Sequence, residues 1–103
     1  MEQIERISYM ENILDDASSA VNKLSEALEE YCGIQDRYME LYEYYGGDLW
    51  VEDFEADEAG KLPKDLKRGV LSEDAVYDLI TDNKELVVKM LETAAESIKK
   101  TLA

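Results

Sequence analysis

Apolar residues recur at alternating steps of three and four along the first 45 residues of this chain. This apolar stripe, which Gln35 interrupts, consists of Ile7, Met10, Leu14, Ala17, Val21, Leu24, Leu28, Tyr31, Tyr38, Tyr42 and Tyr45. Such spacing places the side chains on one face of an α-helix, and helices normally bury that face against other helices. We therefore predict a long amphipathic helix over residues 1–45. Flanking positions are mostly apolar too, which suits a helical bundle better than a two-stranded coiled coil.

Glycines bear on the length of this predicted helix. Gly33 costs roughly 1 kcal/mol relative to alanine in a helix interior, but the stripe keeps its register across it, so we predict an unbroken helix. Gly46 and Gly47 follow and are typical of a helix C-terminus. An unbroken helix would leave much of the stripe exposed in one chain, so we expect a homodimer around a two-fold axis. A break at Gly33 is the alternative, and it would allow a compact monomer.

Residues 46–70 form a connector of a different composition, with a block of acidic residues followed by a block of basic ones. Blocks of opposite sign can fold onto each other. We predict that Asp48 caps a short helix, that Pro63 occupies a first helical position, and that Gly69 ends the one short turn after it. Trp50 and Phe54 predict an ordered, docked connector, because such large side chains need a surface that buries them.

Residues 71–103 begin with a helix-start signal. Ser72 is a good N-cap, and Leu71 and Val76 can form a hydrophobic staple across it. The following segment is amphipathic, and Asp82 with Glu85 resembles a second capping box, which predicts a kink or a new helix there. We therefore predict one all-α domain over residues 1–103, in which one or two C-terminal helices pack back on the first helix as a bundle.

Charge and composition narrow the classes of function. The 103 residues include 25 acidic and 11 basic side chains, for a formal net charge of −14. This charge disfavours nucleic acids and anionic membranes as partners and favours a basic protein. The chain has no histidine, which excludes histidine-dependent catalytic triads and histidine-ligated zinc. A lone cysteine, Cys32, the absence of a secretory signal and the lack of a long apolar run indicate a cytoplasmic protein.

Two groups of carboxylates resemble metal sites. Asp53, Glu55 and Asp57 have the spacing of the first ligands of an EF-hand loop, but Glu58 and Lys64 stand where that loop needs glycine and glutamate. All-helical pyrophosphohydrolases gather carboxylates from two helices around magnesium, and the corresponding candidates here are Glu40, Glu43, Glu73, Asp74 and Asp78. Glu40 and Glu43 occupy outward heptad positions, however. We therefore predict no catalytic residue, no cofactor and no metal site.

Aromatic and basic side chains provide the remaining candidates. The candidate interaction or structural surface consists of Tyr38, Tyr42, Tyr45, Trp50, Phe54, Lys64 and Arg68. Tyrosines on an apolar stripe are usually core residues whose hydroxyl groups reach solvent or backbone carbonyls. We interpret the basic residues as counter-charges for the neighbouring acidic block.

One stretch carries a family resemblance. Tyr44-Tyr45-Gly46, Trp50, Asp53 and the run from Leu62 to Asp74 resemble a bacterial family known as domain of unknown function 4298. Members of that family are about as long as this chain, so the resemblance implies a small bacterial protein. It implies no activity, cofactor or site residue.

The sequence thus favours a non-catalytic protein–protein interaction module. A small metal-dependent hydrolase that uses helix carboxylates is one alternative. An acidic mimic that occupies a basic nucleic-acid-binding protein is another, and it would bind its partner less tightly as salt increases.

Overall fold

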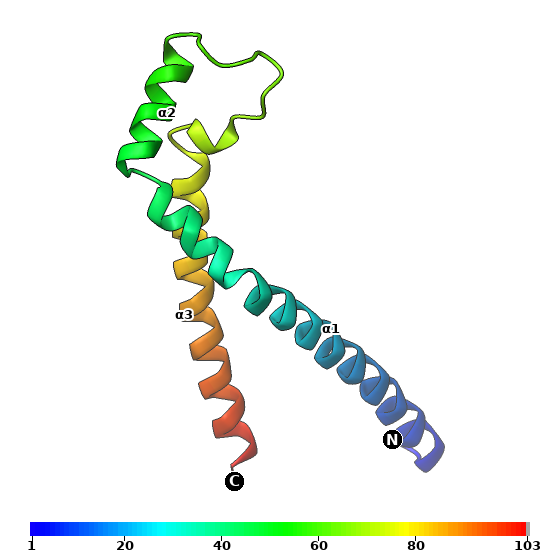
Figure 1. Ribbon diagram of the computed structural model, residues 1–103. Coiled ribbons are helices and arrows are strands. Elements are labelled where there is room, and N and C mark those ends of the chain that lie inside the picture. The colour runs from blue at the N-terminus through cyan, green and yellow to red at the C-terminus, as the bar shows by residue number, and fades with distance from the viewer. Residues whose placement is uncertain (103) are drawn as a thin grey trace. The chain divides into compact units, whose positions relative to one another are not determined.

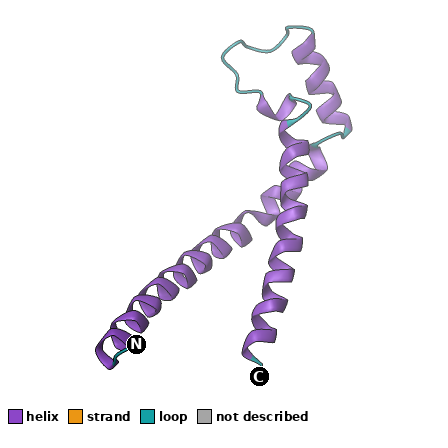
Figure 2. Cartoon of the chain, turned by 180° about the vertical axis from the view of Figure 1, so that it is seen from behind, coloured by secondary structure: helices purple, strands orange, loops and turns teal. Residues whose placement is uncertain are grey.

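The computed structural model of this protein describes residues 1–102. Within this range the elements are α1 (Gln3–Tyr44), α2 (Asp48–Glu58), the 3-10 helix η1 (Gly69–Leu71) and α3 (Ala75–Thr101) (Figure 1). The other described residues form turns and loops, and no β-strand occurs among them (Figure 2). The all-α class that the sequence predicts is therefore confirmed.

The chain divides into two compact units, Met1–Met39 and Glu40–Ala103, which we call the N-terminal and C-terminal units. The N-terminal unit consists of α1 alone, and the last residues of α1 belong to the C-terminal unit. The boundary lies within a continuous helix and not in a flexible linker. None of the helices in residues 1–102 is both long enough and apolar enough to cross a lipid bilayer.

Helix α1 is unbroken across Gly33, so the long N-terminal helix is confirmed and the alternative of two shorter helices is wrong. The helix ends at Tyr44, one residue before the predicted boundary. Gly46 follows with φ of +78°, a left-handed conformation that residues with a side chain rarely adopt. The glycine pair therefore ends the helix as the sequence predicts.

The aliphatic part of the apolar stripe in the N-terminal unit is exposed, whereas Tyr31 and Tyr38 are half-buried. Val21 and Leu24 are 66% and 59% accessible, and Ile7, Met10 and Leu14 are each more than half accessible. The predicted bundle would have buried these side chains, so that part of the prediction is not found in the single chain. The physical reason is that the N-terminal unit contains a single helix, which cannot cover its own apolar face.

Helix α2 begins and ends differently from the prediction. Asp48 is its first helical residue and not its N-cap, which is Gly47, and the cap has no side-chain hydrogen bond. At the other end Gly60 has φ of +69°, and the amides of Gly60 and Lys61 donate to the carbonyls of Asp57 and Ala56, each at 3.0 Å. This pattern is a Schellman motif, which the sequence analysis missed although glycine at this position is its usual signal.

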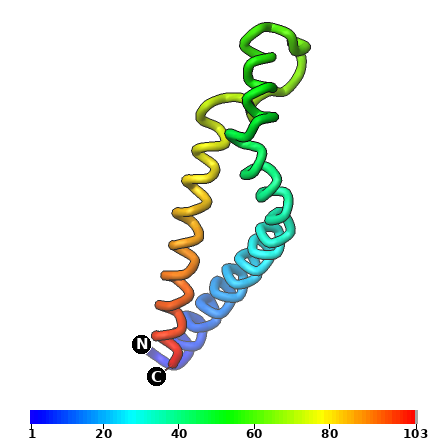
Figure 3. The backbone as a smooth tube through the Cα atoms, turned by 60° about the vertical axis from the view of Figure 1, so that its left-hand side comes forward, coloured from blue at the N-terminus to red at the C-terminus, as the bar shows by residue number. Residues whose placement is uncertain are grey.

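The basic half of the connector contains no α-helix. Pro63 begins a single turn in which the Leu66 amide donates to the Pro63 carbonyl at 3.2 Å, so the prediction of a helical position for Pro63 is wrong. Gly69 begins η1 and does not end a turn, which corrects the second expectation for this segment. The path from α2 through this loop and η1 into α3 can be followed in Figure 3.

Helix α3 is unbroken from Ala75 to Thr101, so the kink or new helix predicted near Asp82 is wrong. The N-cap of α3 is Asp74, without a side-chain hydrogen bond, so the prediction that Ser72 is the N-cap is wrong by two residues. Ser72 ends η1 and still satisfies an amide at the start of α3, because its hydroxyl oxygen accepts the Ala75 amide at 3.2 Å, and the hydroxyl donates to the Gly69 carbonyl at 2.8 Å.

Leu71 and Val76 are the buried side chains of the described residues, with 6% and 3% of their surface accessible. They belong to η1 and to the first turn of α3, and the sequence analysis paired them as a hydrophobic staple. Both α2 and the start of α3 contact η1. The small core of the C-terminal unit therefore lies where these three helices meet.

Candidate functional site

Trp50 of α2 is the centre of an aromatic cluster in the C-terminal unit. Its ring lies edge-on to Tyr45, with centroids 5.4 Å apart, and stacks on Phe54, with centroids 5.1 Å apart. Its indole N–H donates a hydrogen bond to the Val70 carbonyl at 3.0 Å. Phe54 lies one turn after Trp50 on the same helix, which is why the two rings can stack. The docking of the connector through Trp50 and Phe54, predicted from the sequence, is present in the structure.

Tyr45 ties this cluster to the start of α3. The Tyr45 hydroxyl donates to the Glu73 carbonyl at 3.1 Å. Glu73 lies in the turn that precedes α3, where carbonyl groups have no helical partner to donate to them. One tyrosine thus contacts α2 with its ring and the start of α3 with its hydroxyl.

Tyr44 and Asp53 form the closest polar pair between α1 and α2. The Tyr44 hydroxyl donates to Asp53 Oδ2 at 2.5 Å. Burial, the hydrogen bond to Asp53 and the negative charge of that carboxylate raise the pKa of Tyr44 to about 12 from an ordinary 10.0. The phenol therefore stays protonated well above neutral pH and acts as a donor, not as a base or nucleophile.

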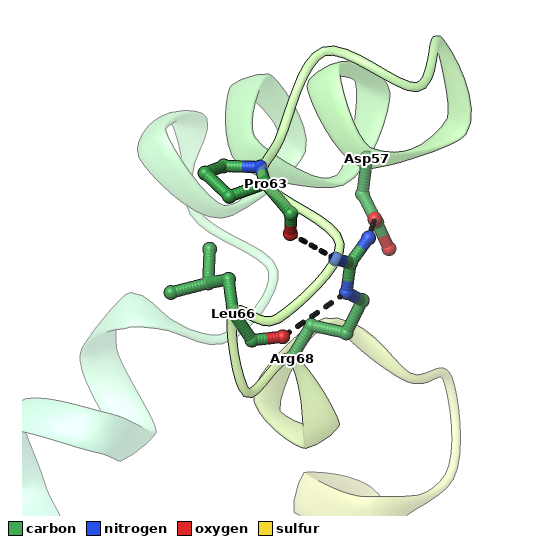
Figure 4. Close-up of polar contacts among 4 residues, drawn as sticks. All are labelled: Asp57, Pro63, Leu66 and Arg68. Atoms are coloured by element: carbon green, nitrogen blue, oxygen red, sulfur yellow. Dashed lines mark hydrogen bonds and ion pairs between the residues drawn. The ribbon is translucent and has the colours of Figure 1, made fainter.

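Arg68 holds the loop that follows α2 (Figure 4). Its guanidinium pairs with Asp57 at 2.5 Å, donates to the Pro63 carbonyl, and donates through Nε to the Leu66 carbonyl at 3.3 Å. The planar guanidinium offers several N–H groups in fixed directions, which suits it to three acceptors at once. Through the pair of Arg68 and Asp57, the basic block of the connector contacts the acidic block, as the sequence predicts. It uses Arg68 as an internal counter-charge and not as a free anion site.

A hollow of about 280 Å³ adjoins this structure. It is lined by Tyr44, Asp53, Leu62, Leu66, Lys67, Val70 and Leu71. Its volume lies at the lower limit of small-molecule sites, which occupy about 300–1,000 Å³. Its walls are largely leucine and valine, and the phenol and carboxylate that it contains are already bonded to each other. The hollow can take up a small apolar group, but it presents no nucleophile paired with a base.

The structure brings together three of the predicted surface residues, Tyr45, Trp50 and Phe54, in the aromatic cluster. Arg68 lies in the separate set of contacts with Asp57 and the loop. Lys64 is exposed in the loop, Tyr42 is exposed on α1, and Tyr38 is half-buried in the N-terminal unit. The sequence analysis predicted that the basic block pairs with the acidic block, but it did not identify Asp57 as the partner of Arg68 or predict the contact between Tyr44 and Asp53.

The carboxylates considered for metal binding have other positions than a metal site requires. Asp53, Glu55 and Asp57 lie in α2, where successive residues turn by about 100°, so they do not form an EF-hand loop. The candidates for the hydrolase alternative, Glu40, Glu43, Glu73, Asp74 and Asp78, are all exposed. Among residues 1–102, no three acidic or cysteine side chains are grouped closely enough to hold a metal ion.

The exposed stripe of the N-terminal unit is a second candidate surface. It carries two shallow hollows along one helix. One, of about 400 Å³, is lined by Ala17, Ser18, Val21 and Asn22, and the other, of about 470 Å³, by Ala27, Glu30, Tyr31, Gly33 and Ile34. Small residues leave these hollows beside the large apolar side chains. Such a surface can accept side chains from a second helix.

Comparison with known proteins finds one family. The family model described as Domain of unknown function (DUF4298) matches residues 7–93, which include both candidate surfaces. No curated protein and no solved structure matches the chain.

Proposed function

This chain belongs to the family Domain of unknown function (DUF4298), and on that premise we propose that it is a non-catalytic interaction module that binds another protein helix through its apolar stripe. We propose the bacterial cytoplasm as its location, because the family resemblance is bacterial and a single cysteine is typical of a reducing compartment. The C-terminal unit has a supporting role in this proposal.

The exposure of the stripe is the observation that carries the proposal. Its large aliphatic side chains recur in register over the N-terminal unit, with Val21 66% and Leu24 59% accessible. Scattered exposed apolar residues are normal on protein surfaces, but a continuous exposed patch usually marks an interface. A second helix that covers this face would remove those side chains from water, at about 25 cal/mol for each Å² of apolar surface buried.

The polar groups of the C-terminal unit support the division of roles. Arg68, Asp57, Tyr44 and Asp53 are bonded to one another or to backbone carbonyls of the same unit. Groups engaged in this way stabilise a local structure and are poorly placed to recognise a partner. The cluster is therefore best explained as the scaffold that orders α2 and the start of α3.

Capture experiments test the proposal. The full chain is immobilised and exposed to a lysate of its source organism, and bound proteins are identified by mass spectrometry. A variant with Leu14→Lys and Leu24→Lys introduces charge on the stripe, and a matched control with Asn12→Lys and Ser19→Lys introduces the same charge on the opposite face. We expect the control to retain what the unmodified chain captures and the stripe variant to lose it. Equal capture by both variants would contradict the proposal.

Two further measurements separate the alternatives. Saturable binding of magnesium or manganese in a calorimetric titration would favour a metal-dependent hydrolase over an interaction module. Capture that weakens steeply with salt and is unaffected by the stripe variant would favour an acidic mimic of nucleic acid, because charge–charge binding is screened by salt.

A further inference from the structure

We infer that the helix bound by the stripe is the stripe of a second copy of this chain, aligned antiparallel so that Val21 of each copy lies opposite Leu24 of the other. This inference rests on the proposed function and adds the identity and orientation of the partner. A two-fold axis between the two helices would make the interface self-complementary, as in most homodimers.

In one antiparallel register, the first half of the stripe in each copy faces the second half of the stripe in the other copy, from residue 7 to residue 38. In it Val21 faces Leu24, and the outer pairs, each of which occurs twice, are Leu28 with Ala17, Leu14 with Tyr31, Ile7 with Tyr38, and Met10 with Gln35. Large residues mostly face smaller ones or flat aromatic rings in these layers. The polar Gln35 lies near an end of the interface, where water can reach it, and its amide already donates to the Tyr31 carbonyl at 3.1 Å.

One hollow on α1 lies where this register needs it, because the hollow beside Ala17 and Val21 stands opposite Leu28 of the other copy. The second hollow extends from Tyr31 to the outward-facing Glu30 and Gly33, so it lies at the edge of the seam, near Leu14 of the other copy. Side chains that enter hollows of this kind produce knobs-into-holes packing. Along the edges of the seam, small residues face each other as Ala20 with Ala27 and Ser18 with Ser25, which lets the two helices approach closely.

The distribution of charge favours a second copy in spite of the net charge of −14. Between residues 12 and 35, all charged side chains occupy the three heptad positions that face away from the seam, namely Asp15, Asp16, Lys23, Glu26, Glu29 and Glu30. An acidic chain with charges along its seam would repel its own copy. Two copies would therefore meet along a face whose central part, residues 12–35, carries no charge, while Glu11 lies at the edge of the seam near each end.

The same argument selects the antiparallel orientation. Residues 40–103 contain 16 acidic and 8 basic side chains. A parallel pair would join two such acidic segments to the same end of the seam. An antiparallel pair joins them to opposite ends of a seam that is roughly 50 Å long at 1.5 Å per residue, several times the screening length of about 8 Å at physiological salt.

The area of the stripe is sufficient for a weak to moderate dimer. A face roughly 50 Å long and about 10 Å wide offers on the order of 500 Å² per copy, and two copies reach about 1,000 Å², the lower bound for a specific interface. We therefore expect reversible self-association that depends on concentration. Light scattering coupled to gel filtration, over a dilution series of the full chain, measures this directly.

A charge-swap experiment tests partner and orientation together. Val21→Glu and Leu24→Lys are made in separate chains, and each alone is expected to weaken self-association at least about tenfold, because it places unpaired charges in an apolar seam. Mixing the two chains should restore a dimer, since the antiparallel register places the glutamate opposite the lysine and leaves the other Val21–Leu24 pair intact. In a parallel pair each position meets its own equivalent, so mixing would relieve the repulsion between like charges but leave each introduced charge opposite an apolar side chain, and association would stay below that of the unmodified chain.

Matched controls distinguish loss of the interface from the effects of added charge or loss of helix. Asn12→Glu and Ser19→Lys add the same charges on the outward face and should leave the dimer mass unchanged. Circular dichroism confirms that each variant remains helical, so that loss of the dimer is not loss of the helix. In a Cys32→Ser background, Leu14→Cys alone should form no disulfide between copies, because position 14 meets itself only in a parallel pair.

The outcomes distinguish this inference from the proposed function. A monomer mass at every concentration, or failure of the mixed variants to associate, would overturn the second-copy inference. If lysate capture still depended on the stripe, the interaction function would stand with a different partner. Self-association that the Val21→Glu and Leu24→Lys variants leave unchanged would overturn the inference as well.

Discussion

In this protein the unit with the more regular apolar pattern makes fewer tertiary contacts than the unit with the less regular one. The N-terminal unit has the most regular apolar periodicity in the chain, yet its stripe is exposed. The C-terminal unit contains the charged connector, which has no clear periodicity, yet its aromatic rings, carbonyls and ion pair form the specific contacts of the fold. Regular periodicity records which face a helix can bury. It does not say whether the same chain supplies the covering surface.

The difference assigns separate tasks to the two units. A helix satisfies its own backbone hydrogen bonds, so α1 keeps its form along its length while presenting an apolar face. The loop between α2 and η1 has no helical hydrogen bonds, so its backbone carbonyls need donors from elsewhere. Trp50, Tyr45 and Arg68 supply those donors. The experiments below test this contrast between an ordered cluster and an uncovered stripe.

The largest effect is expected at the centre of the cluster. Trp50→Ala removes two ring contacts and the hydrogen bond to Val70, and it should lower the free energy of unfolding by about 3 kcal/mol. Leu49→Ala is the matched control, because Leu49 precedes Trp50 on the same helix and its own side chain is 67% accessible. Urea unfolding followed by circular dichroism provides the comparison. Equal losses for the two variants would mean that Trp50 does not hold the connector.

The same substitution in each unit tests the contrast directly. Leu71→Ala, in the buried core, should cost about 2 kcal/mol, whereas Leu24→Ala, on the exposed stripe, should cost less than about 0.5 kcal/mol at concentrations where the chain is monomeric. Urea unfolding at low protein concentration measures both. A comparable cost for Leu24→Ala under those conditions would show that the stripe is covered within one chain.

A smaller effect is expected where η1 meets α3. Ser72→Ala removes the hydroxyl that accepts the Ala75 amide and donates to the Gly69 carbonyl, and it should cost roughly 1 kcal/mol. Ser72→Thr retains both bonds and should be nearly neutral. Ser72→Asp retains the capping acceptor but cannot donate to Gly69, so its stability should fall between the two. Thermal unfolding ranks the three variants, and equal stability of all three would remove Ser72 from the capping role.

The last prediction concerns alkaline pH, where Tyr44 loses its proton. Because the pKa of Tyr44 is raised to about 12 in the folded chain, the folded state holds this proton more tightly than the unfolded state does. The resulting stabilisation is complete below about pH 10 and is lost as the pH rises from about 10 to about 12. Tyrosinate absorbance measures the titration. Tyr44→Phe should remove the part of the absorbance change near pH 12, and Asp53→Asn should move the titration of Tyr44 to lower pH.

Several features of the fold follow from the sequence because they depend on neighbours along the chain. The length of α1 follows from the spacing of its apolar residues, its end at Tyr44 from Gly46, and the burial of Leu71 and Val76 from their positions around Ser72. The match of residues 7–93 to a family of unknown function likewise confirms a resemblance carried by local motifs. These signals act over a few residues, so no tertiary contact was needed to interpret them.

Local rules also produced the errors. Asp48 and Pro63 have good propensities for helix starts, but Gly47 precedes α2 and the Pro63 segment forms one turn held by Arg68. Asp82 and Glu85 match a capping box within a helix that continues through them. In each case a propensity of at most about 1 kcal/mol was outweighed by contacts or by continuation of the helix.

The sequence by itself determined that this protein is helical, acidic and amphipathic over its first 45 residues, because helix periodicity and charge are properties of the chain. Only the tertiary structure decided which aromatic and charged residues meet. Tyr44 finds Asp53 and Arg68 finds Asp57 and Pro63 because α2 and the loop after it fold back on one another, an arrangement that spacing along the chain does not specify. The structure also decided that the stripe stays exposed, since a lone helix can expose or bury its apolar face with the same sequence, and only the presence of a covering surface distinguishes the two.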